Sequence, residues 1–509
     1  MNKISNFINR HVVLVVSFFI YVCCYVLLNS RGPLVDNDTI EYVGFAKALT
    51  EGSFPTSPYY QPGVGVLIFI FKKLFFTDYL TAFRLLNFTA GFGLVLVLQR
   101  LFKLAFNSHK YILISIAAMP VIVYLSSLLY ADIVFDFFAF LNLLYLVKSF
   151  KDGIDQKPIW QASILTALSV FMKYNGLAVW VTGMVFIGIR GWINKQFIKN
   201  IFSYGVIYSL FPIGYVIFWR IFNGNLAMVQ FNQWIEPVTF DCIIVYLKQN
   251  WVSSYHLFLD RGMLNLASMM NHYIILAAIL VIVMAIFKVL KINIEVIKSK
   301  ILNSAFIILL LFSFIYLFAV NTMEGLNCRT EPCVRLYSCT FIGLGILLMG
   351  LFAVFSNRFN KTIWPLFIYV GMGVYLISIH WRNHNETEGI VINKNNSSYI
   401  SAIQFLQHEN TKGIVYGFGT PKINRYWWSL GGDFNALGVF HYQQHHSMGH
   451  NYVYDDTTYL NMIVKHGQSM KPSEYLVVEL EKSFISHEIP KIKNLKTVFK
   501  QDNVYVFQK

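Results

Sequence analysis

The chain has 509 residues, of which 56% are hydrophobic and only 13% are charged. Soluble domains carry about 25% charged residues, so this composition excludes an ordinary soluble globular protein and indicates a protein built for a lipid bilayer. The formal net charge of +15 could suggest a nucleic-acid partner, but the positions of the Lys and Arg residues argue against one.

Long apolar runs recur along most of the chain. A run of roughly 17 to 25 apolar residues is long enough to cross a bilayer as a helix. The runs predict about eleven membrane-spanning helices, the first of which is retained because it lacks a small-residue cleavage site. They lie near 11–29, 81–102, 109–130, 132–149, 158–172, 175–193, 200–221, 272–290, 301–321, 336–356 and 362–380.

The connections between these runs alternate in charge. Loops on the cytoplasmic side of membrane proteins are enriched in Lys and Arg, so the N-terminus is expected inside. The basic residues of the inner loops are then Arg100, Lys103, Lys110, Lys148, Lys151, Lys157, Arg190, Lys195, Lys199, Lys288, Lys291, Lys298, Lys300, Arg358 and Lys361. This regular alternation accounts for much of the positive charge, places the C-terminus outside and makes a nucleic-acid partner an unsupported hypothesis.

The composition changes at about residue 382. The following segment, NHNETEGIVINKNNSSYISAIQFLQHEN, is polar, and the later runs GIVYGF, YLVVEL and NVYVFQ are typical of buried strands. We therefore expect a polytopic helical membrane domain over 1–381 and a small extracytoplasmic α/β domain over 382–509. Two outer segments, 30–80 and 222–271, are rich in aromatic residues and are expected to lie along the membrane surface.

Polar residues that packing does not explain gather at the predicted outer ends of the helices. They follow the first helix, start the second and the fourth, join the fifth to the sixth, and precede the tenth. The acids are Asp36, Asp38 and Asp132, and the cations are Arg84, Lys173 and Arg335. Distant parts of the sequence are thereby predicted to bring both charges to one membrane boundary.

Each of these residues also has a simpler explanation. A single Arg or Lys at a helix end commonly extends to the lipid head groups. A carboxylate such as Asp132 commonly caps a helix, and Asp136, one turn deeper, fits a packing or solvated role. Asp36 and Asp38 could belong to a solvated loop. The set is more informative than its members, because the positive-inside bias leaves few basic residues at outer helix ends.

Together these residue types suit phosphate chemistry at a membrane surface. Arg and Lys bind phosphate, which at a leaflet boundary belongs to a lipid-linked donor. A nearby carboxylate can accept the proton of an attacking hydroxyl. Arg84, Lys173 and Arg335 would stabilise the charge that develops on the leaving phosphate. The pattern predicts glycosyl transfer from a polyprenyl-phosphate sugar.

Five segments within the first 190 residues resemble the GT-C glycosyltransferases, in particular the protein mannosyltransferase and aminoarabinose transferase group. They are DTIEYVGFAKALTEG, YYQPGVGVL, AFRLLNFTAG, LYADIVFDFFAFLNLLYL and ILTALSVFMKYNGLAVWV. In the first segment Asp38 stands four positions before Tyr42, which is the spacing of the family's first-loop acid. The other segments place Arg84, Asp132 and Lys173 at the family's polar positions. The remaining chain resembles the family by architecture only.

Two departures from the family pattern affect the predicted site. Thr39 stands where a second acid is expected, which leaves open whether Asp36 or Asp38 is the base; the spacing to Tyr42 favours Asp38.

The second departure lies in the element that is Lys-Pro-Pro-like in the family and here, after the aromatic Tyr60, reads Gln61-Pro62-Gly63. Gln61 replaces the Lys, so one contact to the donor phosphate is either missing or supplied by another residue.

The resemblance implies an inverting transferase in the bacterial cytoplasmic membrane, with an undecaprenyl-phosphate sugar as donor and the C-terminal domain in the periplasm. Related enzymes use lipid A, protein or O-antigen repeat units as acceptors. The similarity to serotype-converting glucosyltransferases favours a hexose, such as glucose, and O-antigen or another surface polysaccharide as the glycan or lipid-linked acceptor.

No motif indicates a cofactor. Cys328, Cys333 and Cys339 cluster at the predicted outer face, but their spacing does not fit a zinc site; a disulfide between Cys328 and Cys333 and free thiols are both open. The His-rich segment 440–450 fits a polar loop better than a metal site, and a divalent metal has no support in the sequence.

Two alternative functions remain at this stage. A polysaccharide polymerase would also use lipid-linked substrates, but it would not require the Asp38–Tyr42 element. A flippase or transporter should carry ionisable residues near the middle of its spans, whereas the middles here are nearly free of charge.

Overall fold

The computed structural model forms two compact units, one made of residues 1–33 and 41–382 and the other of residues 34–40 and 383–509. The structure describes residues 2–29, 37–52, 61–106, 110–150, 155–193, 195, 197–223, 303–326, 337–356, 397–408, 415–418, 437–439, 470–479, 495–502 and 504–509.

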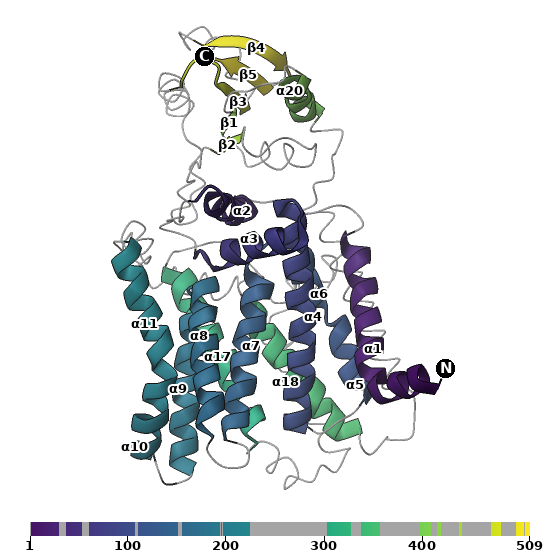
Figure 1. Ribbon diagram of the computed structural model, residues 1–509, viewed down its shortest axis with the longest axis vertical. Coiled ribbons are helices and arrows are strands. Elements are labelled where there is room, and N and C mark those ends of the chain that lie inside the picture. The colour runs from purple at the N-terminus through teal and green to yellow at the C-terminus, as the bar shows by residue number, and fades with distance from the viewer. Residues whose placement is uncertain are drawn as a thin grey trace, which may run out of the picture. The chain divides into compact units, whose positions relative to one another are not determined.

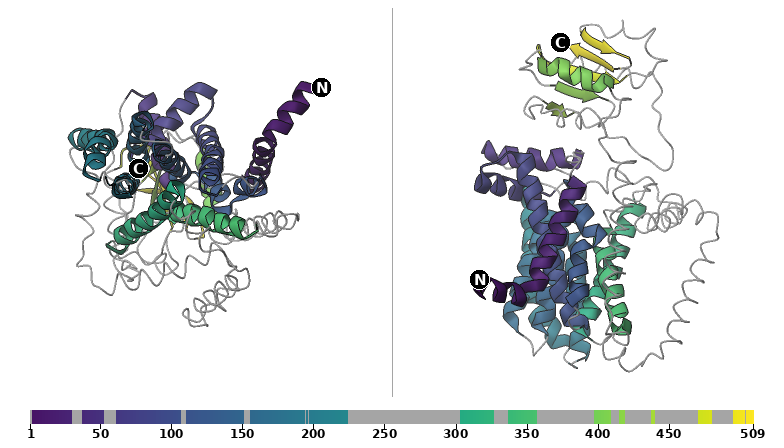
Figure 2. Two further views of the ribbon diagram at one scale, coloured as in Figure 1. Left: turned by 90° about the horizontal axis from the view of Figure 1, so that it is seen from below. Right: turned by 90° about the vertical axis from the view of Figure 1, so that its right-hand side faces the viewer.

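The first unit is a helical bundle in which most helices run side by side, while α3 runs across the end of the bundle (Figures 1 and 2). Its helices are α1 (Asn2–Asn29), α2 (Asn37–Thr50), α3 (Gly63–Phe75), α4 (Tyr79–Phe106), α5 (Lys110–Ser115), α6 (Pro120–Ser127), α7 (Asp132–Ser149), α8 (Gln156–Met172), α9 (Gly176–Ile193), α10 (Phe197–Asn200), α11 (Val206–Asn223), α17 (Ser304–Leu326) and α18 (Ser338–Ser356). The first four residues of α2 belong to the second unit.

Several expected spans are found as helices, and α7 matches its expected bounds. Among the described residues three helices are long and apolar enough to cross a membrane: Tyr79–Phe106, Gly176–Ile193 and Ile201–Ile221. Shorter apolar helices cover His11–Leu27, Ile112–Ser127, Ser304–Val320 and Ser338–Leu347. The expected spans at 272–290 and 362–380 lie outside the described residues, so the number of spans stays a prediction.

One expected span differs from a continuous helix. Residues 110–127 form α5, a 3-10 turn at Ile116–Ala118, and α6. The interruption comes before Pro120, at the N-terminus of α6, where Met119 adopts an extended conformation. Proline lacks the N–H that a continuing helix would need and forces the preceding residue out of the helical region.

The bundle is held together by aromatic packing and by a buried polar network. Asn142 of α7 donates to Thr166 Oγ1 of α8 at 2.6 Å, and Thr166 donates to the Tyr208 hydroxyl of α11 at 2.9 Å. All three side chains are fully buried. Since buried polar groups need partners, this network fixes how these three helices pack around the centre of the unit.

The second unit contains α20 (Ser397–His408) and a five-stranded sheet in the order β2-β1-β3-β5-β4. Its strands are β1 (Val415–Phe418), β2 (Leu437–Val439), β3 (Tyr475–Glu479), β4 (Lys496–Gln501) and β5 (Val504–Gln508). β1 is parallel to β2 and β3, whereas β5 is antiparallel to β3 and β4. The expected strands in GIVYGF, YLVVEL and NVYVFQ are therefore present, and Phe405 of α20 stacks on Phe499.

Candidate active site

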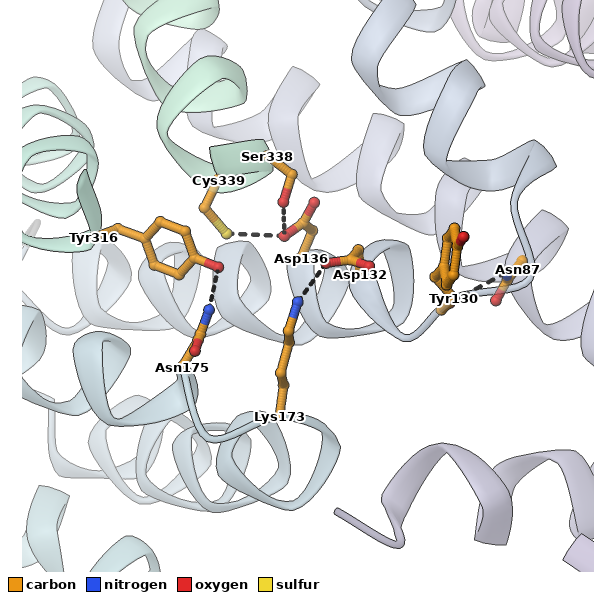
Figure 3. A network of polar contacts seen from close by, with 9 residues as sticks. All are labelled: Asn87, Tyr130, Asp132, Asp136, Lys173, Asn175, Tyr316, Ser338 and Cys339. Atoms are coloured by element: carbon orange, nitrogen blue, oxygen red, sulfur yellow. Dashed lines mark hydrogen bonds and ion pairs between the residues drawn. The ribbon is translucent and has the colours of Figure 1, made fainter. Parts of the chain in front are cut away.

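Asp132 and Lys173 form a buried ion pair in the helical unit (Figure 3). Lys173 Nζ donates to Asp132 Oδ1 at 2.5 Å. The Asp132 side chain is only 4% exposed and that of Lys173 is 18% exposed. α7 begins at Asp132 and α8 ends just before Lys173, so the ends of two neighbouring helices bring the charges together.

The ion pair excludes the simpler explanations given above for Asp132, as a helix cap, and for Lys173, as a single cation that extends to the lipid head groups. Asp132 does not cap α7, because Ala131 occupies the cap position and no side chain caps this helix. Lys173 is not a lone cation at a helix end, because its charge is balanced by a buried carboxylate. Breaking such a pair leaves an uncompensated buried charge, so each partner fixes the position of the other.

Asp136 lies one turn further along α7 and is completely buried. Its Oδ1 accepts hydrogen bonds from Ser338 Oγ and Cys339 Sγ, both at 2.9 Å (Figure 3). The solvated role considered from the sequence is therefore wrong. Asp136 instead ties α7 to the first turn of α18, while Asp132 ties the same face of α7 to Lys173.

The four-residue spacing of the two acids could have indicated this arrangement, because residues i and i+4 share one face of a helix. No feature of the sequence identified Ser338 or the buried thiol of Cys339 as the partners of that face. Beside them, Asn175 donates to the Tyr316 hydroxyl at 3.1 Å and joins α17 to the turn after Lys173.

Arg84 enters the same end of the bundle from α4. It is partly exposed, and its guanidinium forms no ion pair within the described part of the chain. One turn later, the buried Asn87 amide donates to the carbonyl oxygens of Leu128 at 2.5 Å and Tyr130 at 3.4 Å. Asn87 therefore connects the helix that carries Arg84 to the segment that leads into Asp132.

Gln61 lies in a second cluster, whose members carry no charge. Its side chain is 2% exposed, and its Oε1 accepts a hydrogen bond from the Tyr215 hydroxyl. Tyr215 stacks on Trp219 with ring centroids 6.3 Å apart, and Trp219 Nε1 donates to the Tyr174 hydroxyl at 3.3 Å. Burial raises the pKa of Tyr174, although the hydrogen bond from Trp219 acts in the opposite direction, so this phenol stays neutral near pH 7.

The start of α3 is pressed against the end of α8. A Cβ atom at Gly63 would overlap the carbonyl oxygen of Phe171, so only glycine fits this approach. This contact sets Gln61, two positions earlier, beside the turn that carries Lys173 and Tyr174. Gln61, which stands where the family has a Lys, is a neutral amide, and its hydrogen-bond partner Tyr215 is also neutral.

Tyr42 is buried, and its ring meets Phe83 edge-on at a centroid distance of 6.1 Å. Phe83 precedes Arg84, so Tyr42 packs α2 against the start of α4. Asp38 lies in the first turn of α2, four positions before Tyr42.

Several other predictions lie outside the described residues. They concern Asp36, Tyr60, Arg335, the Cys328–Cys333 disulfide and the His-rich segment. Cys339 is a free, buried thiol. In the part of the chain that the structure describes, no group of three His, Cys, Asp or Glu residues is arranged to hold a metal ion.

The described polar groups can hold an anion beside a neutral hydrogen-bonding surface. Lys173 has three ammonium hydrogens and uses one on Asp132, so the others remain available to an oxygen ligand. The larger exposed fraction of Lys173 shows that the ion pair is accessible from the lysine side.

Comparison with solved structures identifies the fold. ArnT from Cupriavidus metallidurans in the apo state is similar with a TM-score of 0.60 and 10% identity over 97% of both chains. The same protein bound to undecaprenyl phosphate gives a TM-score of 0.59 and 9% identity over 97% of both chains.

The oligosaccharyltransferase AglB from Archaeoglobus fulgidus, in complex with an inhibitory peptide and a dolichol-phosphate, gives a TM-score of 0.53. It is 12% identical over 94% of this chain and 70% of that chain. No protein-family model and no curated protein matches the sequence. The chain therefore has the fold of the GT-C glycosyltransferases, as the motifs of its first 190 residues led us to expect.

Proposed function

We propose that this chain is a membrane-bound glycosyltransferase that takes its sugar from a polyprenyl-phosphate donor. The observation that carries the proposal is the buried Asp132–Lys173 ion pair at the helix ends of a GT-C fold. Two proteins of this fold have been solved with undecaprenyl phosphate or a dolichol-phosphate bound, which supports a lipid phosphate as the ligand.

The finer proposal rests on the sequence resemblance. The donor is undecaprenyl phosphate carrying a hexose, such as glucose, and the acceptor is a hydroxyl of O-antigen or another surface polysaccharide. The reaction takes place on the periplasmic face of the bacterial cytoplasmic membrane, with the C-terminal α/β domain on the same side.

The proposed chemical step is an inverting displacement. The acceptor hydroxyl oxygen forms a bond to the anomeric carbon, and the bond from that carbon to the phosphate oxygen breaks. The proton of the hydroxyl passes to the carboxylate of Asp38, with Asp36 as the alternative base. The polyprenyl phosphate leaves with the bonding electrons, and nearby cations stabilise its added charge.

Lys173 is proposed as one of these cations, and Asp132 as the residue that holds it in place. With Asp132 as a fixed partner, the ammonium group need not reorganise when the donor arrives, which is the condition for efficient electrostatic stabilisation. Arg84 and Arg335 are proposed as further contacts to the phosphate, and Gln61 as a neutral neighbour that replaces one cation of the family.

The test is a transfer assay with the full chain in proteoliposomes, using a labelled polyprenyl-phosphate hexose and a purified polysaccharide acceptor. Asp38→Ala is expected to reduce transfer by about 100-fold or more, because a general base contributes at least that much. Asp155→Asn is the matched control, since Asp155 caps α8 and Asn preserves that cap.

Loss of activity in Asp36→Ala with full activity in Asp38→Ala would reassign the base. The reaction class is tested separately by mass spectrometry of surface glycans from cells with and without the gene. One added hexose per repeat unit supports the proposal, whereas loss of whole repeat units would indicate a polymerase.

A further inference from the structure

The corner between α3 and α4 presents three consecutive apolar side chains to the outside. Leu74 is 65% exposed, Phe75 is 55% exposed and Phe76 is 95% exposed. The other face of α3 is buried through Val64 and Ile68. A contiguous apolar patch of this kind normally marks a surface that another molecule covers.

The backbone at this corner is held in an unfavourable conformation. Phe76 ends α3 with φ 50° and ψ 43°, in the left-handed region, and its N–H donates to the carbonyl oxygen of Lys72. Glycine or asparagine normally occupies this position of a helix end, because a bulky side chain is strained there. A phenylalanine that is almost entirely exposed gains no packing inside the chain to offset that strain.

Lysine side chains flank the patch. Lys72 Nζ lies 4.7 Å from the centre of the Tyr79 ring, and Lys73 Nζ lies 5.8 Å from that of Phe69. Cations beside aromatic rings are typical of the membrane–water boundary, where apolar groups enter the lipid and ammonium groups stay at the level of the phosphates.

The position of the patch in the fold indicates the occupant. α3 runs across the end of the bundle (Figures 1 and 2), and Phe76 comes three residues before α4, which is long and apolar enough to cross a membrane. We propose that the corner formed by Leu74, Phe75 and Phe76 inserts into the lipid leaflet, with Lys72 and Lys73 bound to anionic phospholipid head groups.

The test places a photoreactive benzoylphenylalanine at position 76 of the full chain, in vesicles of phosphatidylethanolamine and phosphatidylglycerol. Illumination is expected to give phospholipid adducts that mass spectrometry detects. The positive control is the same residue at Phe314, which is 57% exposed on α17, and the negative control is Phe83, which is 0% exposed. A crosslink to a second copy of the chain, or a yield no higher than at Phe83, would overturn the proposal.

The role of the lysines is tested by Lys72→Gln combined with Lys73→Gln. The ratio of phosphatidylglycerol to phosphatidylethanolamine adducts is expected to fall by up to about fivefold for each lysine removed. Lys103→Gln is the matched control, because Lys103 is an exposed lysine in the last turn of α4, at the end of that helix away from the corner. If the double variant gave the same ratio of phosphatidylglycerol to phosphatidylethanolamine adducts as the unaltered chain, Lys72 and Lys73 would not bind anionic head groups.

A third variant keeps the proposal testable if the photoreactive residue prevents folding. Phe76→Gly relieves the strained backbone and is expected to raise the Tm in detergent, whereas Phe76→Ala is not. Both variants are expected to loosen the corner in vesicles, measured as faster hydrogen exchange at the α3–α4 junction. Exchange in vesicles equal to that of the unaltered chain would contradict membrane insertion.

Discussion

Lys173 and Tyr174 are neighbours in sequence but belong to two different clusters. Lys173 is extended, with φ −159° and ψ 141°, and pairs with Asp132 of α7. Tyr174 instead accepts a hydrogen bond from Trp219 of α11. One cluster is charged and the other is neutral, although both are largely buried.

The turn at Lys173 and Tyr174 therefore contributes one residue to a charged cluster and the next to a neutral one. The charged cluster depends on mutual compensation, because each buried charge is costly without its partner. The neutral cluster depends on individual hydrogen bonds and ring packing, whose contributions are smaller and more local. Removal of single groups should therefore have very different effects in the two places.

The largest effect is expected for Lys173→Met, which leaves the Asp132 carboxylate buried without its cation. We expect a loss of about 3 kcal/mol in the free energy of unfolding. The measurement is thermal unfolding in detergent micelles.

The matched control adds Asp132→Asn to Lys173→Met, which removes both charges. This double variant should regain most of the lost stability but not the transfer activity. A double variant as unstable as Lys173→Met would show that the pair is not the reason for the loss.

The next effect concerns Asp136, which belongs to the charged cluster but contacts neutral donors. Asp136→Ala leaves the Ser338 hydroxyl and the Cys339 thiol without an acceptor and should cost about 2 kcal/mol. Asp136→Asn keeps an acceptor oxygen and should cost less than half of that. Equal losses in the two variants, measured by chemical unfolding, would mean that the charge of Asp136 matters rather than its acceptor role.

A smaller effect is expected in the neutral cluster. Gln61→Leu removes the acceptor of the Tyr215 hydroxyl and should cost about 1 kcal/mol, since no charge is left unpaired. Tyr215→Phe removes the other partner and should cost about the same. A cost for Gln61→Leu as large as that for Lys173→Met would remove the distinction between the clusters.

The smallest effect is expected for an exposed carboxylate at the start of α4. Asp78 Oδ1 accepts the backbone N–H of Thr81 at 2.9 Å. Partial burial acts to raise the pKa of Asp78, but the hydrogen bonds from Thr81 and the neighbouring backbone outweigh it and lower the pKa below its usual value.

Because the folded-state pKa of Asp78 is lowered, its contribution to stability is present at neutral pH and is lost as the pH falls through that pKa. Asp78→Ala should cost about 1 kcal/mol near pH 7 and progressively less towards acidic pH. Unfolding midpoints at several pH values check this. If the difference in stability between the unaltered chain and Asp78→Ala stayed constant with pH, the hydrogen bond from the Thr81 N–H to the ionised Asp78 carboxylate would not be its cause.

The sequence by itself determined the membrane-protein class and the expectation of a GT-C fold. It also gave the bounds of α7 and α9 to within a residue and located three strands of the C-terminal sheet. These features depend on local composition and periodicity, because an apolar run or a buried strand can be recognised from its own residues, without knowing which elements pack against it.

Tertiary structure alone decided how the polar residues are partnered. Asp132 and Lys173 stand 41 positions apart, and Asp136 and Cys339 stand 203 apart, so no local pattern links them. Of the packing and solvated roles expected for Asp136, burial decides for packing and makes the carboxylate an acceptor for two side chains of α18. The continuous span expected over 109–130 is wrong at Pro120, where the helix is interrupted. The pairing of buried charges follows from packing, because only the folded chain removes these groups from water and forces each to find a partner.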